Sequence, residues 1–146
     1  MNKAIFVLIP ILVLLIFGAV FYNLYKLAQP TAEIKGHKFQ LIVVKSDKDK
    51  QVGLSKYKEI PDDKAMVFVF EKADAYPFWM KDMKFPIDII FMKDNKIVTI
   101  YQNLPINNLT IYLPTESSDK VLETNANISK KYNFSVGDSV VFKNLK

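Results

Sequence analysis

The residues best suited to chemistry lie in an aromatic and polar segment, 78–83 (FWMKDM). Trp79 is the only tryptophan, and its indole could stack on a sugar ring or another flat ligand, with Lys81 and Asp82 supplying polar contacts. If the segment is extended, alternation places Trp79 on the same face as Lys81 and Met83. The alternative is that Trp79 closes one end of the hydrophobic core.

Three further polar residues are candidates for a ligand-binding or acid–base site. Asp88 interrupts an apolar segment (IDIIF), and Glu123 and Asn125 lie close together in the segment VLETNA. A period of two predicts that Asp88 faces outward, whereas a buried Asp88 would need Lys81 or a cluster of backbone groups as its partner. The carboxylates of Glu123, Asp88 and Asp82 could bind a hard cation or transfer protons if the fold brought them together. Glu123 and Asn125 could equally fix a loop by hydrogen bonds to the backbone.

Composition excludes several classes of site. The chain has no cysteine, which rules out disulfides, thiolate zinc ligands and cysteine nucleophiles. His37 is the only histidine, and the four glycines are isolated, so we expect no metal site, no cofactor and no serine–histidine triad. The formal net charge is +5, but lysines alternate with acids and arginine is absent. Nucleic acid is therefore not an expected partner.

A hydrophobic segment without charge, 4–22 (AIFVLIPILVLLIFGAVFY), lies near the N-terminus. As an α-helix it would span about 28 Å, close to the thickness of a membrane's hydrocarbon core. Tyr22, Tyr25 and Lys26 follow, as at a membrane interface. We therefore predict a transmembrane helix over about 4–25, within an anchor that comprises residues 1–27. The alternative is a cleaved signal peptide, whose apolar region is shorter, about 7 to 15 residues, and is followed by small residues.

Beyond the anchor we predict a linker over 28–38 and a β domain over 39–146. No segment is suited to a long crossover helix between parallel strands, and one or two short helical turns are expected over 47–58 and 127–132, with Asn127 as an N-cap. The pattern predicts a mostly β, compact antiparallel sandwich, jelly-roll-like domain or barrel. Apolar segments bounded by turn residues predict strands over 39–45, 65–70, 87–92, 97–101, 110–113, 120–123 and 139–143.

The ordered motifs of this domain resemble those of the uncharacterised domain-of-unknown-function family 192. The central match is FWMKDM followed by FPIDIIF, and the similarity covers roughly residues 39–142. The chain departs from the family pattern at Ser55, at Asp82-Met83 and at Asn127, where the family usually has Met, Asn-Thr and Gly. The flanking matches are Gly53-Leu54, the strand 66–70, Asn103, Pro105, Val121-Leu122-Glu123, Asn125-Ala126 and Gly137-Asp138.

The resemblance implies a compact β-sandwich or jelly-roll-like domain that in prokaryotes often follows a signal peptide or lipid anchor. It implies no reaction and identifies no catalytic residue. We therefore expect an extracytoplasmic domain on the cell membrane, working as a binding or accessory module of the envelope for a glycan or small molecule. The alternatives are an envelope hydrolase or carbohydrate-active enzyme that uses Asp88 or Glu123, and a purely structural or protein-interaction domain. The hypothetical ligand-binding residues are Trp79, Lys81, Asp82, Asp88, Glu123 and Asn125.

Overall fold

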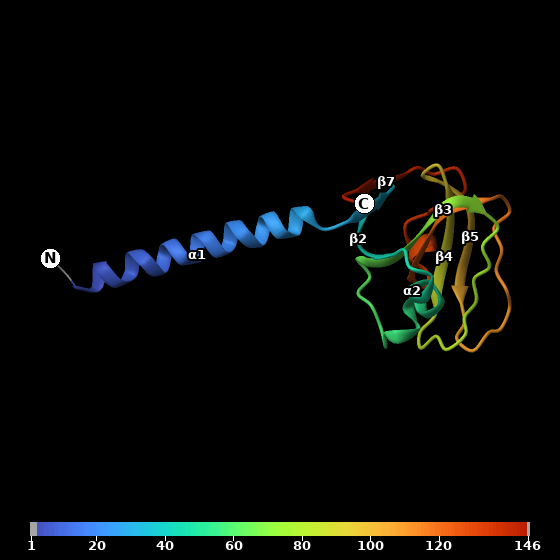
Figure 1. Cartoon of the computed structure of the whole chain (residues 1–146), viewed down its shortest axis with the longest axis horizontal. Helices are drawn as coiled ribbons and strands as arrows, with labels where there is room; N and C mark the ends of the chain where they lie inside the picture. The colour runs from blue at the N-terminus through green and yellow to red at the C-terminus, as the bar shows by residue number, and fades with distance from the viewer. Residues whose placement is uncertain (1–2, 146) are drawn as a thin grey trace.

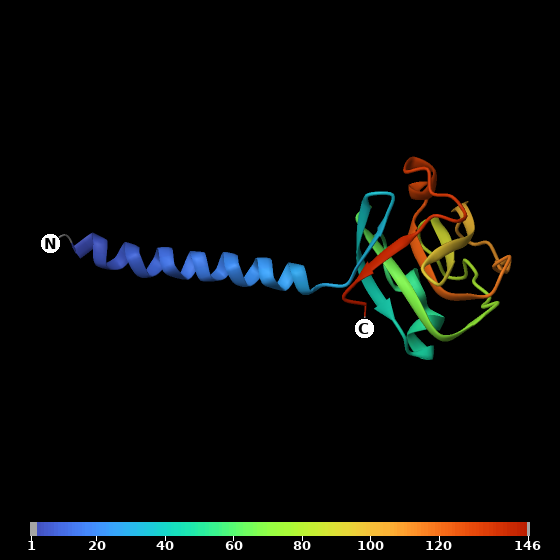
Figure 2. The ribbon, with the colours of Figure 1, turned by 90° about the horizontal axis from the view of Figure 1, so that it is seen from above.

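A long helix, α1 (Lys3–Ala28), projects from a separate β domain in both views of the molecule (Figures 1 and 2). The computed structural model describes residues 3–145, with side chains in the first helix described from Ile11 onward. The part of the helix from Ile11 to Ala28 is apolar and buries none of its residues against the domain. This helix is long and apolar enough to cross a membrane, although a signal sequence would share those properties.

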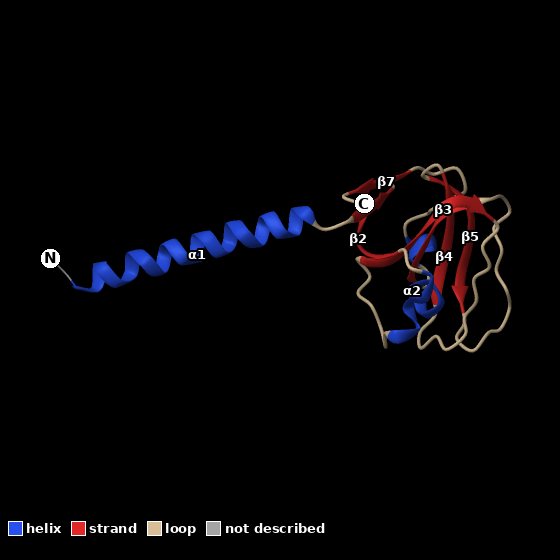
Figure 3. Cartoon of the chain, viewed as in Figure 1, coloured by secondary structure: helices blue, strands red, loops and turns tan. Residues whose placement is uncertain are grey.

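Within residues 3–145, seven strands form one curled sheet in the order β5-β4-β6-β3-β2-β1-β7 (Figure 3). The short helical segments lie in the connections. The strands are β1 (Thr31–Ile34), β2 (His37–Val44), β3 (Lys64–Asp74), β4 (Ile87–Lys93), β5 (Lys96–Leu104), β6 (Ser118–Asn125) and β7 (Val140–Lys143). The helical segments are α2 (Asp47–Val52), the 3-10 helix η1 (Gly53–Lys56) and α3 (Ile128–Lys131).

The two edge strands of this sheet meet at one end. Lys96, at the start of β5, forms an isolated bridge with Ser139, just before β7. Beside it, the backbone N–H of Ile97 donates to the carbonyl oxygen of Asp138 at 3.0 Å. These bonds close part of the sheet into a half-barrel, because a twisted sheet can satisfy its edges by pairing them. The prediction of a mostly β domain with short helical turns is confirmed.

Two predictions about connectivity are wrong. Strand β2 pairs with β3 in parallel, so the sheet is mixed rather than purely antiparallel. The connection over 45–63 contains only α2 and η1, which shows that a parallel return needs sufficient chain length rather than one long helix. The predicted linker over 28–38 contains β1, which pairs with both β2 and β7. Ala32 and Ile34 of β1 are buried, so the segment belongs to the core.

Of the shorter predicted elements, one hairpin is present in the structure and one strand is not. The β4–β5 hairpin is confirmed, and Asp94 and Asn95 at its turn have φ of 50° and 59°, a conformation that suits tight hairpins. The predicted strand over 110–113 is wrong, because only Tyr112 pairs there, in a single bridge with Phe78. The bridge stays single because the chain around Tyr112 is a surface loop, whose backbone polar groups can bond to water instead of to a neighbouring strand.

Both faces of the central strands are buried. Met66 and Ile89 belong to one apolar cluster, whereas Val67 and Ile90 belong to a second cluster on the other face. Asp88 is consequently fully buried on β4. The prediction that Asp88 faces outward is wrong, because it assumed that one face of this strand meets solvent.

Candidate functional site

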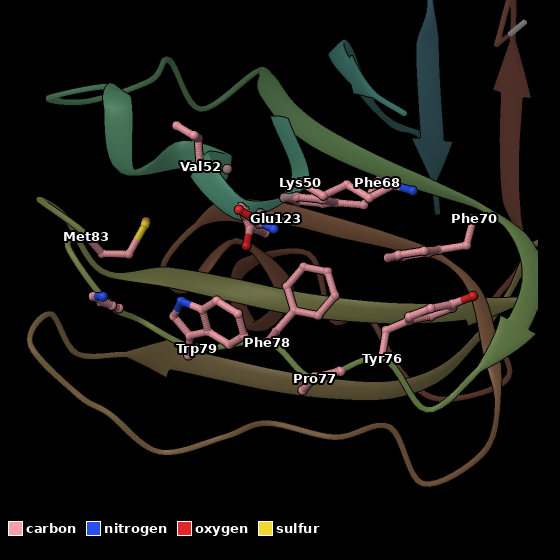
Figure 4. Close-up of a pocket in the computed structure, with 13 residues that line it drawn as sticks. Lys50, Val52, Phe68, Phe70, Tyr76, Pro77, Phe78, Trp79, Met83 and Glu123 are labelled. Atoms are coloured by element: carbon pink, nitrogen blue, oxygen red, sulfur yellow. The ribbon is translucent and has the colours of Figure 1, made fainter. Parts of the chain in front are cut away.

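A pocket of about 170 Å³ lies between α2, β3 and the chain that precedes β4 (Figure 4). Five aromatic side chains line it, together with two lysines, a glutamine and one glutamate. The polar residues are Lys50, Gln51, Lys81 and Glu123. The aromatic residues are Phe68, Phe70, Tyr76, Phe78 and Trp79.

The rings of the wall hold one another in place. Phe70 and Tyr76 stack with centroids 3.6 Å apart and planes 10° apart. Phe78 meets Phe68 edge-on at 4.9 Å between centroids. Trp79 is 41% exposed, so its indole is at the opening of the pocket rather than in the core. A wall that is already packed in this way loses little conformational entropy when a ligand enters.

Glu123 provides the buried carboxyl group of the pocket. It lies on β6, opposite Met66 of β3 and Ile89 of β4, and the residue is only 4% exposed. Burial raises the pKa of Glu123 to about 8, while a hydrogen bond from the backbone of Leu54 acts in the opposite direction. At neutral pH the group is therefore mainly a neutral carboxylic acid that can donate its O–H. Its Oε2 atom has no hydrogen-bond partner among the described residues.

Gly53 allows the main chain to approach this carboxyl group closely. Its φ is 52°, and a Cβ atom there would lie 3.4 Å from the Phe68 ring and 3.7 Å from Oε2 of Glu123. Glycine adopts a positive φ without steric penalty, which lets the chain turn from α2 into η1 and present Leu54 to the carboxyl group. The step Gly53-Leu54 and Glu123, far apart in the sequence, thus form one local structure.

The family model for DUF192, described as Uncharacterized ACR, matches residues 30–142 of the chain. The chain belongs to the DUF192 family. The earlier resemblance is therefore confirmed, and the family's description assigns no activity to the DUF192 domain. No curated protein matches the chain with significant similarity.

Two solved structures share the fold of this DUF192 domain. A protein of unknown function from Novosphingobium aromaticivorans has a TM-score of 0.72 and 26% identity, over 77% of this chain and 83% of its own. A proposed transcription regulator from Sinorhizobium meliloti has a TM-score of 0.75 and 25% identity, over 80% of this chain and 95% of its own. Both comparisons support the half-barrel described above.

Asp88 of the DUF192 domain lies away from the pocket. In the pairing of β4 with β6, Asp88 is opposite Thr124 and Ile89 is opposite Glu123, so the two carboxyl groups point to opposite faces of the sheet. The partners of Asp88 are backbone N–H groups, as the second alternative for this residue required. The donors are Asn103 at 2.8 Å, Asn127 at 2.9 Å and Ser129 at 2.8 Å.

Asp88 also replaces the helix cap that was predicted for Asn127. Asn127 occupies the N-cap position of α3, but its φ is 67° and its side chain makes no capping hydrogen bond. The oxygens of Asp88 instead accept the N–H groups of Asn127 and Ser129. A buried carboxyl group on β4 thereby fixes both the end of β5 and the start of α3, which is a structural role.

Asn125 and Asp82 are also outside the pocket. The Nδ2 of Asn125 donates to the carbonyl oxygen of Ile60 and to Oδ1 of Asp62, both at 2.8 Å, and thereby fastens the loop before β3. Asp82 is exposed with a φ of 60°, because the chain turns at Lys81 and Asp82 instead of continuing as a strand. The predicted grouping of Trp79, Lys81 and Met83 agrees with the pocket lining, which contains all three, but Phe78 lines the pocket as well because the segment is not a continuous strand.

Three of the six predicted site residues therefore come together in the pocket: Trp79, Lys81 and Glu123. The predicted grouping of Asp82, Asp88 and Glu123 does not form, and the described residues contain no cluster of three His, Asp or Glu side chains able to hold a metal ion. Sequence reasoning missed the contribution of Phe70, on β3, and of Lys50. Aromatic residues in a strand are typical of core packing, so no local signal distinguished them.

Proposed function

We propose that this chain is a membrane-anchored binding module that takes one small ring in its aromatic pocket. The observation that carries the proposal is the unpartnered Oε2 of Glu123 inside an apolar pocket of about 170 Å³. A cavity of about 150 Å³ is enough to hold benzene. Because a buried polar atom without a partner is unfavourable, the pocket suits a ring that brings a polar group to Glu123. A sugar ring and a small aromatic molecule both meet this description.

Binding is favoured over hydrolysis because Glu123 is the single carboxyl group that lines the pocket. Most glycoside hydrolases use two carboxyl groups about 5–9.5 Å apart, and Asp88 faces the other side of the sheet. One observation favours the enzyme as a second candidate. The raised pKa of Glu123 is what a general acid needs near neutral pH.

Trp79 fluorescence of the full chain in detergent tests the pocket, since Trp79 is the only tryptophan and lines it. We expect phenol or a methyl pyranoside to shift the emission saturably. Val52→Phe should abolish the shift, because a ring at this lining position obstructs the pocket. Val141→Phe, an equally large change at an exposed site on β7, should leave it intact.

The outcomes of this titration separate the three candidate functions. If neither phenol nor a methyl pyranoside changes the Trp79 emission, the structural or protein-interaction alternative would be favoured. Release of product from aryl glycosides that is lost in Glu123→Gln would favour the enzyme. Saturable binding without turnover is the result that supports the binding module.

The cellular arrangement that we propose has α1 retained in the membrane and the domain outside the cytoplasm. The apolar composition of α1 and the domain's separation from it support a retained membrane helix (Figure 1). The placement outside the cytoplasm rests on the family resemblance. Because the chain has no cysteine, a single Glu116→Cys change on the exposed domain surface gives a label without background. We expect a membrane-impermeant maleimide to label Glu116→Cys in intact cells, on a membrane-bound protein of full length.

Lys3→Cys, on the other side of the hydrophobic segment, is the matched control and should react only after the cells are permeabilised. The opposite labelling pattern would place the domain inside the cell. A shortened protein in the soluble fraction would instead identify the N-terminal segment as a cleaved signal sequence.

A further inference from the structure

We propose that the pocket binds a small ring carboxylate, with the ring between the aromatic walls, the carboxylate bound by the lining lysines Lys50 and Lys81, and a hydroxyl or carbonyl group of the ring bound to Glu123. This inference rests on the proposed binding function and names the chemical class of its ligand. It follows from the charges of the residues that line the pocket.

The inner end of the pocket calls for a hydrogen-bond acceptor. Glu123 is almost completely buried, its Oε2 has no partner among the described residues, and it lies between α2 and the segment that carries Phe78 and Trp79 (Figure 4). As a neutral acid it donates its O–H, and a ligand hydroxyl or carbonyl oxygen can accept that proton. A purely hydrocarbon ring would leave this group unsatisfied.

Two lysines also line the pocket. Lys81 is exposed beside Trp79, and Nζ of Lys50 lies 4.6 Å from the centre of the Phe70 ring. Nζ of Lys50 forms an ion pair at 3.5 Å with Oδ1 of Asp47, an exposed residue that does not line the pocket. Asp82 adjoins Lys81 in sequence but is also absent from the lining. Both lysines line the pocket, and Glu123 is the one acidic residue among the described residues of its lining.

This arrangement disfavours a cationic ligand. Aromatic walls alone would suit an ammonium group, and Lys50 already makes that contact with Phe70. A second cation would meet repulsion from Lys50 and Lys81, with Glu123 mainly uncharged at neutral pH. An anion gains charge-assisted hydrogen bonds from the same lysines.

The probe that matches this description is 4-hydroxybenzoate, with phenol, benzoate and 4-hydroxybenzylamine as comparison compounds. The cross-peak of the single indole N–H, from Trp79, can be followed by NMR during titration of the full chain in detergent micelles. We expect 4-hydroxybenzoate to bind about tenfold more tightly than phenol or benzoate, since each loses one polar contact, and the amine to bind most weakly.

Variants assign the two ends of the ligand. The double variant Lys50→Gln with Lys81→Gln should weaken 4-hydroxybenzoate about tenfold and leave phenol unchanged. The double variant Lys130→Gln with Lys143→Gln removes the same charge from exposed positions outside the pocket lining and should change neither. Glu123→Leu should abolish the preference for 4-hydroxybenzoate over benzoate.

Failure of this proposal is distinguishable from failure of the binding function. Equal affinity for phenol and 4-hydroxybenzoate would be consistent with the proposed ring-binding function but would contradict the proposal that the pocket recognises a carboxylate. Tightest binding of 4-hydroxybenzylamine would also overturn it, in favour of a cationic ligand. The absence of any shift at Trp79 with all four compounds would overturn both proposals.

Discussion

Replacing Asp88 with alanine is expected to lower the free energy of unfolding of the domain by about 3–5 kcal/mol, because hydrogen bonds to carboxylates contribute about 1.5–3 kcal/mol each and are only partly additive. Three backbone N–H groups, of Asn103, Asn127 and Ser129, lose their acceptor in this variant. Asn103 lies near the end of β5, whereas Asn127 and Ser129 lie at the start of α3, so the loss affects both elements. A change of this size is a large part of the stability of a small domain.

Urea denaturation of the full chain, followed by Trp79 fluorescence, measures this loss. Asp63→Ala is the matched control, since Asp63 is exposed and its side chain makes no recorded hydrogen bond, and it should change stability by less than about 0.5 kcal/mol. Asp88→Asn should fall between the two, because the amide retains one acceptor oxygen. Equal stability of Asp88→Ala and Asp63→Ala would contradict the structural role assigned to Asp88.

Glu123→Gln is expected to remove a pH dependence of stability that the wild-type chain carries. The pKa of Glu123 is about 8 in the folded domain, against an ordinary value of 4.5. Between these two pH values the folded state binds more protons than the unfolded state, so the free energy of unfolding falls as pH rises through this window and levels off above it. At about 1.4 kcal/mol for each pKa unit, the loss across the whole window is on the order of 5 kcal/mol by pH 9.

The measurement compares the free energies of unfolding of Glu123→Gln and wild type at pH 5 and at pH 9. We expect the variant to gain several kcal/mol relative to wild type at the higher pH, because its side chain carries no charge to desolvate. Glu71→Gln, an exposed change on β3, should keep the wild-type pH profile. If the free energy of unfolding depends on pH in the same way for wild type and Glu123→Gln, Glu123 is ionised in the folded domain. Its carboxyl group could then not donate an O–H to a ligand in the pocket.

Local patterns predicted a good part of the fold. The apolar segments on either side of Asp94-Asn95 indicated the β4–β5 hairpin, since turn residues and strand propensity are properties of neighbouring residues. Short strands separated by turns gave the mostly β class. The parallel pairing of β2 with β3 and the strand in 31–34 were missed, because both depend on partners that are distant in the sequence.

The candidate site was predicted only in part, for the same reason. Trp79, Lys81 and Glu123 were chosen for their chemical types, and the fold brings them together. Asp88 was chosen on the same grounds, but its place on the other face of the sheet follows from the register of β4 with β6. A one-residue difference along a strand reverses the face of a side chain, and residue type alone does not reveal it.

The sequence by itself determined the apolar helix, the β class, the DUF192 motifs and the absence of cysteine chemistry, because each depends on composition or on short-range order. Only the tertiary structure decided that Gly53-Leu54 packs against Glu123, that aromatic residues of β3 and of the segment after it line one pocket, and that Asp88 is structural. The physical reason is that burial sets the protonation and the partners of a carboxyl group. In this domain burial results from a sheet that curls until both faces of its central strands are covered.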